Sequence, residues 1–143
     1  MLNHYTAIGR LIKDPVLYET GSKQPFCPFR IAVDRDYKNS DGKYEADYIN
    51  CTIWGSGAKI IAERFRKGSR ICIEGRLQTR KYEKDGKKKD ITEVIVSTFY
   101  FVDQKSDSSS LNKGQRLEPD AEPEETLDDY AEAYGDIEPE PEL

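Results

Sequence analysis

The side chains with the most distinctive chemistry in this sequence are aromatic rings that lie on the outward faces of predicted strands. In the stretch 47–54, alternation places Tyr48 and Trp54 on one face and apolar residues such as Ile49 and Ile53 on the other. A single apolar ring on the solvent side of a strand is ordinary. Two large rings on one strand, among basic neighbours, indicate a surface for a flat, anionic ligand.

Two further tyrosines lie beside cationic side chains. Tyr82 shares a predicted strand face with Arg76 and Arg80, and Tyr37 follows Arg35 at the end of another strand. Bases of single-stranded nucleic acid stack on such rings, at about 1–3 kcal/mol per base, while Lys and Arg hold the phosphates. Each tyrosine alone is more typical of core or rim packing, but four rings beside polar or cationic faces favour nucleic-acid binding.

A lysine-rich turn is the next candidate. The stretch 84–89 contains Asp85-Gly86, a strong turn signal, followed by Lys87, Lys88 and Lys89. Two interpretations remain open: a solvated loop, or the last long loop of a barrel that grips a nucleic-acid strand.

Catalytic and cofactor sites are not predicted. His4 is the only histidine and has no companion for a metal site or a triad. The stretch 55–59 resembles a phosphate-binding loop, but Ile60 replaces the third glycine of the dinucleotide fingerprint and Ala58 replaces the glycine before the lysine of the other loop. We therefore expect a binding protein that is not an enzyme and has no metal or cofactor.

Charge divides the chain in two. Residues 1–105 contain 20 Lys and Arg against 14 Asp and Glu, a net charge of +6, whereas residues 106–143 contain 2 against 13, a net charge of −11. The second segment is rich in Pro, Glu and Ser, a composition that cannot bury enough apolar surface to fold. We expect a folded domain over 1–105 and a disordered acidic tail over 106–143.

Part of the tail has apolar residues at helical spacing. A short helix could form there on a partner protein, although a solvated tail is the simpler interpretation. The candidate docking residues are Tyr130, Tyr134, Ile137 and Leu143.

Cysteine use and the lack of targeting signals bear on location. Cys27, Cys51 and Cys72 are odd in number and have no CxxC spacing, which is typical of reduced thiols in or near a core. The chain shows no signal peptide and no apolar run long enough to span a membrane. These features predict a soluble protein of the cytoplasm.

The predicted elements give the order strand, strand, strand, helix, strand, strand. The strands are expected near residues 3–11, 29–34, 48–54, 70–81 and 91–102, and a helix capped by Ser56 and ended by Gly68 lies between the third and fourth. This is the order of the five-stranded OB-fold, a Greek-key barrel that binds oligonucleotides. The fold class is therefore all-β with one short helix.

The sequence also resembles a known family. Residues 66–82, RKGSRICIEGRLQTRKY, are similar to the run RKGS, IEG, L and TRKW of the bacterial and phage single-stranded DNA-binding proteins, the SSB family. The stretch 92–96 resembles the family's TEV strand, and residues 8–15 its opening strand and Asp-Pro turn. The resemblance extends from residue 1 to about residue 103.

The resemblance implies sequence-tolerant binding and protection of single-stranded DNA in replication, recombination and repair, by a homotetramer. Base stacking is expected on Tyr37, Tyr48, Trp54 and Tyr82. Backbone contacts are expected at Arg35, Arg66, Lys67, Arg76, Arg80, Lys81, Lys87, Lys88 and Lys89.

Two implications concern partners of other kinds. Replication and recombination proteins are possible partners of the acidic tail, and no membrane partner is expected. Cellular family members end on an acidic tip with a Pro-Phe pair, whereas this chain ends in Leu143, which favours a phage or mobile-element source. The alternative function is a primosomal-type OB adaptor that acts mainly through protein contacts.

Overall fold

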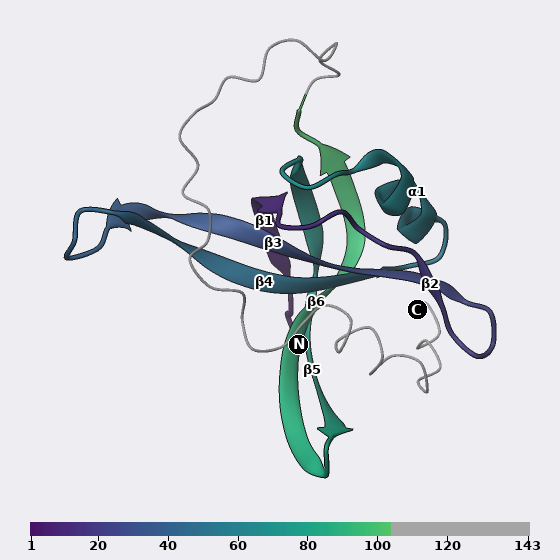
Figure 1. Cartoon of the computed structure of the whole chain (residues 1–143). Helices are drawn as coiled ribbons and strands as arrows, with labels where there is room; N and C mark the ends of the chain where they lie inside the picture. The colour runs from purple at the N-terminus through teal and green to yellow at the C-terminus, as the bar shows by residue number, and fades with distance from the viewer. Residues whose placement is uncertain (104–143) are drawn as a thin grey trace.

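The computed structural model describes residues 1–103 (Figure 1). The predicted domain boundary at residue 105, the acidic tail 106–143 and its four candidate docking residues lie outside the described residues and remain predictions. Among the described residues, no helix is long and apolar enough to cross a membrane.

The described chain forms a closed barrel with one helix. Its elements are β1 (Tyr5–Leu11), β2 (Tyr18–Glu19), β3 (Pro25–Lys38), β4 (Tyr44–Trp54), α1 (Ser56–Arg64), β5 (Arg70–Lys84) and β6 (Lys87–Phe101). The strands pair in the order β1-β5-β6-β4-β3-β2, and a β1–β3 pairing at Leu11 and Ile31 closes the barrel. The β4–β6 pair is parallel and the others are antiparallel. The predicted all-β OB-type barrel is confirmed, with the two-residue β2 as an additional edge strand.

The core follows the predicted alternation. Cys51 and Ile53 of β4 are buried inside the barrel, and Ile49 packs against the core from the same face. The helix α1 packs mainly on β3 and buries Ala58 and Ile61. The barrel therefore leaves the opposite faces of its strands to form the outer surface.

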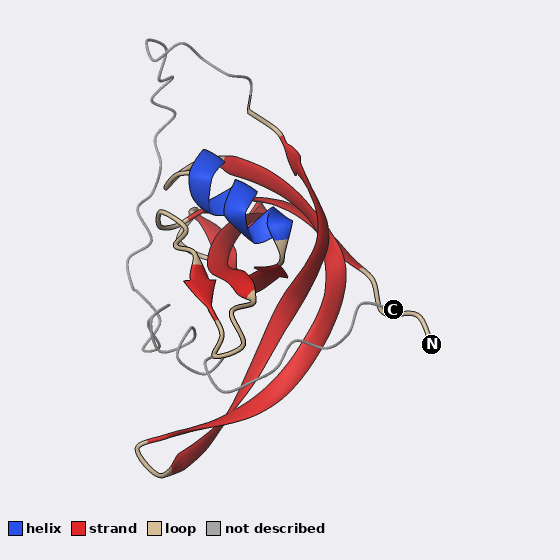
Figure 2. Ribbon diagram, turned by 90° about the vertical axis from the view of Figure 1, so that its right-hand side faces the viewer, coloured by secondary structure: helices blue, strands red, loops and turns tan. Residues whose placement is uncertain are grey.

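Two long hairpins project from the barrel, β3–β4 and β5–β6 (Figure 1). Figure 2 shows the strands of the β5–β6 hairpin curving without interruption from beside α1 to the tip. Asp85 and Gly86 form the predicted turn, with φ of 52° and 76°, and Lys84 pairs with Lys87 across it. The ladder is shifted between Glu74 and Gly75, which forms a bulge in this hairpin.

The helix boundaries differ from the prediction. The residue before the helix is Gly55, with φ of 78°, and no side chain caps it, so Ser56 is the first helical residue and not the cap. The helix ends at Arg64, because Phe65 already has an extended backbone. Gly68, with φ of 89°, belongs to a separate turn before β5 and does not end the helix.

Candidate nucleic-acid interface

Aromatic rings from four strands gather on the outer surface of the barrel. Phe26 of β3 and Ile91 of β6 are buried there, and Tyr18, Trp54 and Tyr82 pack against them half-buried. The Phe26 ring lies 5.0 Å from Trp54 and 5.7 Å from Tyr18, measured between ring centroids. We call these five residues the aromatic cluster. The structure thus brings Trp54 and Tyr82, two of the four predicted stacking residues, into one site.

Phe26, the centre of this cluster, was not predicted as a site residue. The predicted strand begins at Phe29, where the alternation of apolar residues starts, and Pro25 and Pro28 favour a loop before it. In the structure β3 begins at Pro25, and Pro28 is paired only with β4, a position at which a missing N–H is tolerated. The only signal for this site residue in the sequence was the position of an aromatic side chain between two prolines.

Polar side chains cover the middle of the same face. Arg30 lies opposite Asn50, and its Nε donates a 2.7 Å hydrogen bond to Asn50 Oδ1. Arg30 is 6% exposed and Thr52 is fully buried, so this part of the face is packed and not a solvated row. Tyr48 follows, half-buried and opposite Ala32, about 20 Å from Trp54 at strand rise.

A buried ion pair joins β5 to β6 beneath this face. Arg80 Nε donates to Glu93 Oε1 at 3.1 Å, and the two side chains are 9% and 0% exposed. Thr52 Oγ1 lies 3.5 Å from the other carboxylate oxygen of Glu93. Arg80, a predicted phosphate contact, therefore neutralises a buried carboxylate in this structure. The sequence did not identify Glu93, because its parity alone does not reveal its partner on β5.

The cations of the β5–β6 hairpin are divided between its two faces. Tyr82 pairs directly with Lys89, so these two side chains share a face. Lys81 pairs with Asp90 and Lys88 with Glu83, which places both lysines on the other face, beside acidic residues. Lys87 is exposed next to the turn, opposite Lys84. Arg76 donates to Gln78 Oε1 at 2.9 Å on the Tyr82 face.

Tyr37 and Arg35 lie on the opposite side of the β3–β4 hairpin. Arg35 bonds Asp47 and Glu45, each at 2.7 Å, on the β4 face that does not carry Tyr48. The Asp47 hydrogen bond raises the pKa of Arg35 and lowers that of Asp47. An irregularity in β3 lies between Asp34 and Lys38, and Tyr37, 64% exposed, precedes Lys38 within it.

Because Lys38 pairs with Tyr44 on the outward β4 face, its neighbour Tyr37 points to the other face. The four predicted rings therefore do not form one row: Tyr48, Trp54 and Tyr82 face outward, and Tyr37 lies behind them.

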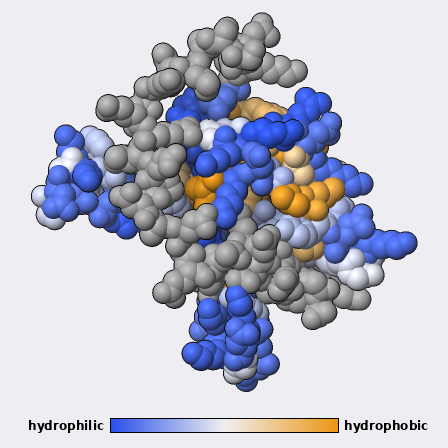
Figure 3. Space-filling model, in the orientation of Figure 1, coloured by the Kyte–Doolittle hydropathy of each residue, from blue (hydrophilic) through white to orange (hydrophobic). Residues whose placement is uncertain are grey.

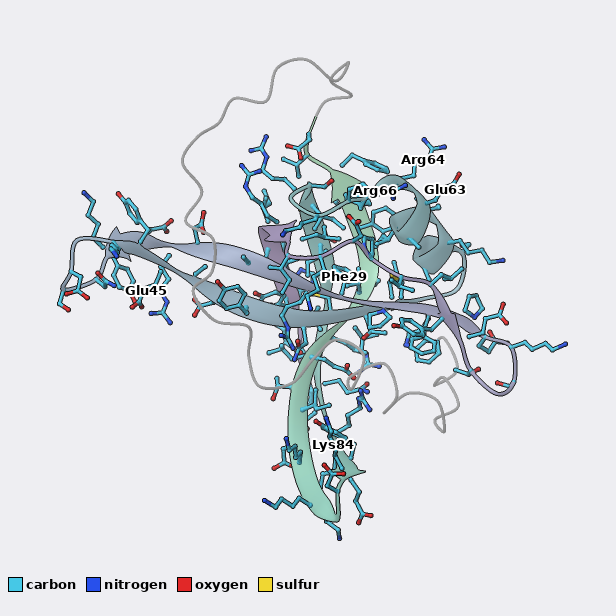
Figure 4. The ribbon with its side chains drawn as sticks, in the orientation of Figure 1. Phe29, Glu45, Glu63, Arg64, Arg66 and Lys84 are labelled. Atoms are coloured by element: carbon cyan, nitrogen blue, oxygen red, sulfur yellow. The ribbon has the colours of Figure 1, made fainter. Side chains whose placement is uncertain are left out.

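Arg66 and Lys67 lie apart from the aromatic cluster. Figure 4 shows Arg66 beside α1, whereas Lys84 marks the far end of the β5–β6 hairpin. Arg66 Nη1 donates to the Phe65 carbonyl at 2.8 Å, which supports the end of the helix. The Lys67 N–H donates to Asp14 Oδ1 at 2.7 Å. Their side chains are exposed on the connection between α1 and β5.

The thiols show no arrangement for chemistry. Cys27 and Cys51 are buried, Cys72 is half-buried, and all three are unbridged. Burial raises the pKa of Cys27 to about 12. Burial, with the nearby Glu93 carboxylate, also raises the pKa of Cys51. The thiols of Cys27 and Cys51 therefore remain protonated at neutral pH, as expected of core residues.

Hydropathy distinguishes the projecting hairpins from the barrel (Figure 3). Both hairpin ends are mostly hydrophilic, whereas apolar residues reach the surface of the barrel body. An outer face with clustered rings, flanked by hydrophilic arms that carry lysines, can bind flat groups joined by charged links.

Comparison with known proteins agrees with this geometry. A sequence model of the single-strand binding protein family matches residues 2–102. The chain is 38% identical to "Single-stranded DNA-binding protein 1" of Streptococcus pyogenes serotype M18 over 128 residues, 89% of this chain and 98% of that protein. It is 39% identical to "Single-stranded DNA-binding protein 1" of Lactococcus lactis over 125 residues, 85% and 83% of the two chains. It is 42% identical to "Single-stranded DNA-binding protein" of Oceanobacillus iheyensis over 106 residues, 73% and 66% of the two chains.

Proposed function

Because the chain belongs to the single-strand binding protein family, we propose that it binds single-stranded DNA with little sequence preference and protects it during replication, recombination and repair. The observation that carries this proposal is the aromatic cluster, in which Trp54 and Tyr82 from different strands lie on one outer face. Stacking on a ring is tolerant of sequence because every base has a π-face. The protein acts by binding and not as an enzyme.

Base stacking is assigned to Trp54, Tyr82 and Tyr48 on the outer face, and to Tyr37 on the other side of the hairpin. Half-burial of the first three supports this role, because a base can cover the exposed part of a ring that is already held in place.

Phosphate contacts are assigned first to the cations of the β5–β6 hairpin and of the α1–β5 connection. Contacts from these residues release counterions from the strand. Arg35 and Arg80 contribute less, because each is already paired with a carboxylate. The assigned cations are Arg66, Lys67, Arg76, Lys81, Lys87, Lys88 and Lys89.

Self-association as a homotetramer is part of the proposal. Among the pairings of residues 1–103, β1 meets β3 only at Arg10 and Leu11, so its edge from Tyr5 to Ile8 is open to another strand. An open strand edge supports pairing with a second copy. The mass of the unbound and DNA-bound protein in solution tests this assembly.

Two further expectations remain proposals. We propose that the acidic tail contacts replication and recombination proteins through Tyr130, Tyr134, Ile137 and Leu143. Because bacterial DNA lies in the cytoplasm, the protein acts there. No observation favours the alternative of an adaptor that works mainly through protein contacts.

Trp54 is the only tryptophan of the chain and gives a direct test. Titration with oligo-dT is expected to quench its fluorescence, with a log–log salt slope of about −0.7 per phosphate contact. The Trp54→Phe variant keeps an aromatic ring but has no tryptophan fluorescence. Its binding, followed by the anisotropy of a labelled oligonucleotide, shows whether DNA binds independently of the Trp54 signal. Absence of both quenching and a gel shift at low salt would refute the proposal.

A further inference from the structure

Tyr44 is an exposed aromatic residue that precedes the strand predicted over residues 48–54. The structure begins β4 at Tyr44, four residues before Tyr48. Residues two and four apart in a strand share a face, so Tyr44 continues the outward row of Tyr48 and Trp54. The β3 irregularity does not affect this row, because β4 itself runs without interruption from Tyr44 to Trp54.

The Tyr44 ring has a cation beside it. Lys38 is the direct cross-strand partner of Tyr44, and its Nζ lies 5.7 Å from the ring centroid. Tyr44 is 54% exposed, so a planar group can reach this side chain. A ring with a cation at its side offers a base a stacking surface and a phosphate a counter-charge.

The acidic residues of the hairpin are divided between its two faces, and Asp34, which pairs with Ala46, lies on the outward face. Glu45 and Asp47 alternate with the outward row and both bind Arg35 on the opposite face. Tyr44 and Lys38 are therefore not shielded by these two carboxylates. The neighbouring ring Tyr48 lies about 13 Å away at strand rise, which is about four nucleotides at the 3.4 Å rise of a stacked strand.

We propose that Tyr44 and Lys38 form an additional stacking station that extends the DNA path onto the distal β3–β4 hairpin. This inference rests on the proposed function, since it assumes that single-stranded DNA follows the outward face. It predicts that the station is reached only by oligonucleotides longer than those that fill the path from Trp54 to Tyr48.

The experiment compares affinity for oligo-dT of increasing length in the full-length protein. Tyr44→Ala is expected to weaken binding of long oligonucleotides about 5- to 100-fold, while short ones bind as before. Tyr44→Phe keeps the ring and is expected to bind normally, whereas Tyr44→Leu keeps apolar surface without a π-face and should resemble Tyr44→Ala. Tyr100→Ala serves as the control, because it removes a tyrosine of similar exposure from the C-terminal end of β6.

A second readout concerns the cation. Lys38→Gln is expected to reduce the magnitude of the salt slope by about 0.7 for long oligonucleotides only. A contact that merely stabilises the hairpin would change the melting temperature without this dependence on length.

The outcomes separate the two proposals. If Tyr44→Ala binds DNA of every length normally while Trp54→Ala is weakened, the additional station is refuted and the proposed function stands. An equal loss at all lengths also refutes the station, because the ring would then act through the fold. If the unsubstituted protein fails to bind, the proposed function itself fails.

Discussion

Replacing Glu93 by glutamine tests whether the buried ion pair holds the outer face together. The change keeps the shape of the side chain and removes its charge, so it leaves no cavity. Arg80, 9% exposed, would then remain buried without its counter-charge. Removing one partner of a buried pair costs about 3–5 kcal/mol, and we expect Glu93→Gln to lose stability in this range.

The loss is large enough to measure in two ways. For a domain of this size, 1 kcal/mol moves the melting temperature by about 4–8 °C, so a decrease of at least about 12 °C is expected. Urea unfolding followed by circular dichroism should give a lower midpoint with an unchanged slope. All variants must be compared at one protein concentration, because self-association adds concentration-dependent stability.

Two controls define the result. The double variant Arg80→Met with Glu93→Leu removes both charges, and we expect most of the stability to return, because apolar pairs often replace buried ion pairs without loss. Arg35→Met breaks an exposed pair and should have a much smaller effect. A loss below about 1 kcal/mol for Glu93→Gln, the range of surface pairs, would refute this reasoning.

Three more predictions follow from single positions or segments. Gly75→Ala should destabilise by at least about 1–3 kcal/mol in urea unfolding, because its Cβ would lie 2.1 Å from the Ile95 carbonyl oxygen, whereas Gly21→Ala meets nothing within 4 Å. Burial raises the pKa of Cys27 to about 12, so the stability contributed by its neutral thiol is complete below the unfolded thiol pKa of about 8.5 and is lost as pH rises toward 12. The urea midpoint should therefore depend less on pH in Cys27→Ala than in the unsubstituted protein. Identical pH profiles for the two proteins would argue against a contribution from this thiol. Deleting residues 106–143 removes a net charge of −11 and should tighten oligo-dT binding at low salt; unchanged or weaker affinity would contradict competition by the tail.

Local pattern was enough to predict the barrel and part of its site. Strict alternation in β4 identified both the buried side and the outward rings Tyr48 and Trp54, because side-chain direction in a regular strand depends only on parity. The Asp85-Gly86 turn was predictable because it depends on the conformational preference of two adjacent residues.

The remaining features depend on contacts between distant segments. The register shift in β3 before Lys38 was not predictable from the sequence, so the direction of Tyr37 became clear only from the pairing of Lys38 with Tyr44. In the sequence Glu93 looks like an ordinary polar strand residue, because its partners Arg80 and Thr52 lie on other strands and meet it only in the folded barrel. Phe26 was not identified because the flanking prolines indicate a loop, whereas in the structure Pro25 pairs only with β2 and Pro28 only with β4.

The packing of Phe26 against Trp54 and Tyr18 has a consequence for the entropy of binding. A side chain that becomes ordered only when a ligand arrives costs about 0.5–1.5 kcal/mol of binding free energy. The Trp54 ring is already held by a neighbour whose centroid is 5.0 Å away, so a base meets a surface that is ordered in advance. The Tyr44 side chain is 54% exposed, and the Nζ of the flexible Lys38 side chain lies 5.7 Å from its ring centroid, so the ordering of this ring accompanies binding. Along β4, the proposed DNA path therefore runs from Trp54, which is ordered before binding, to Tyr44, which becomes ordered on binding.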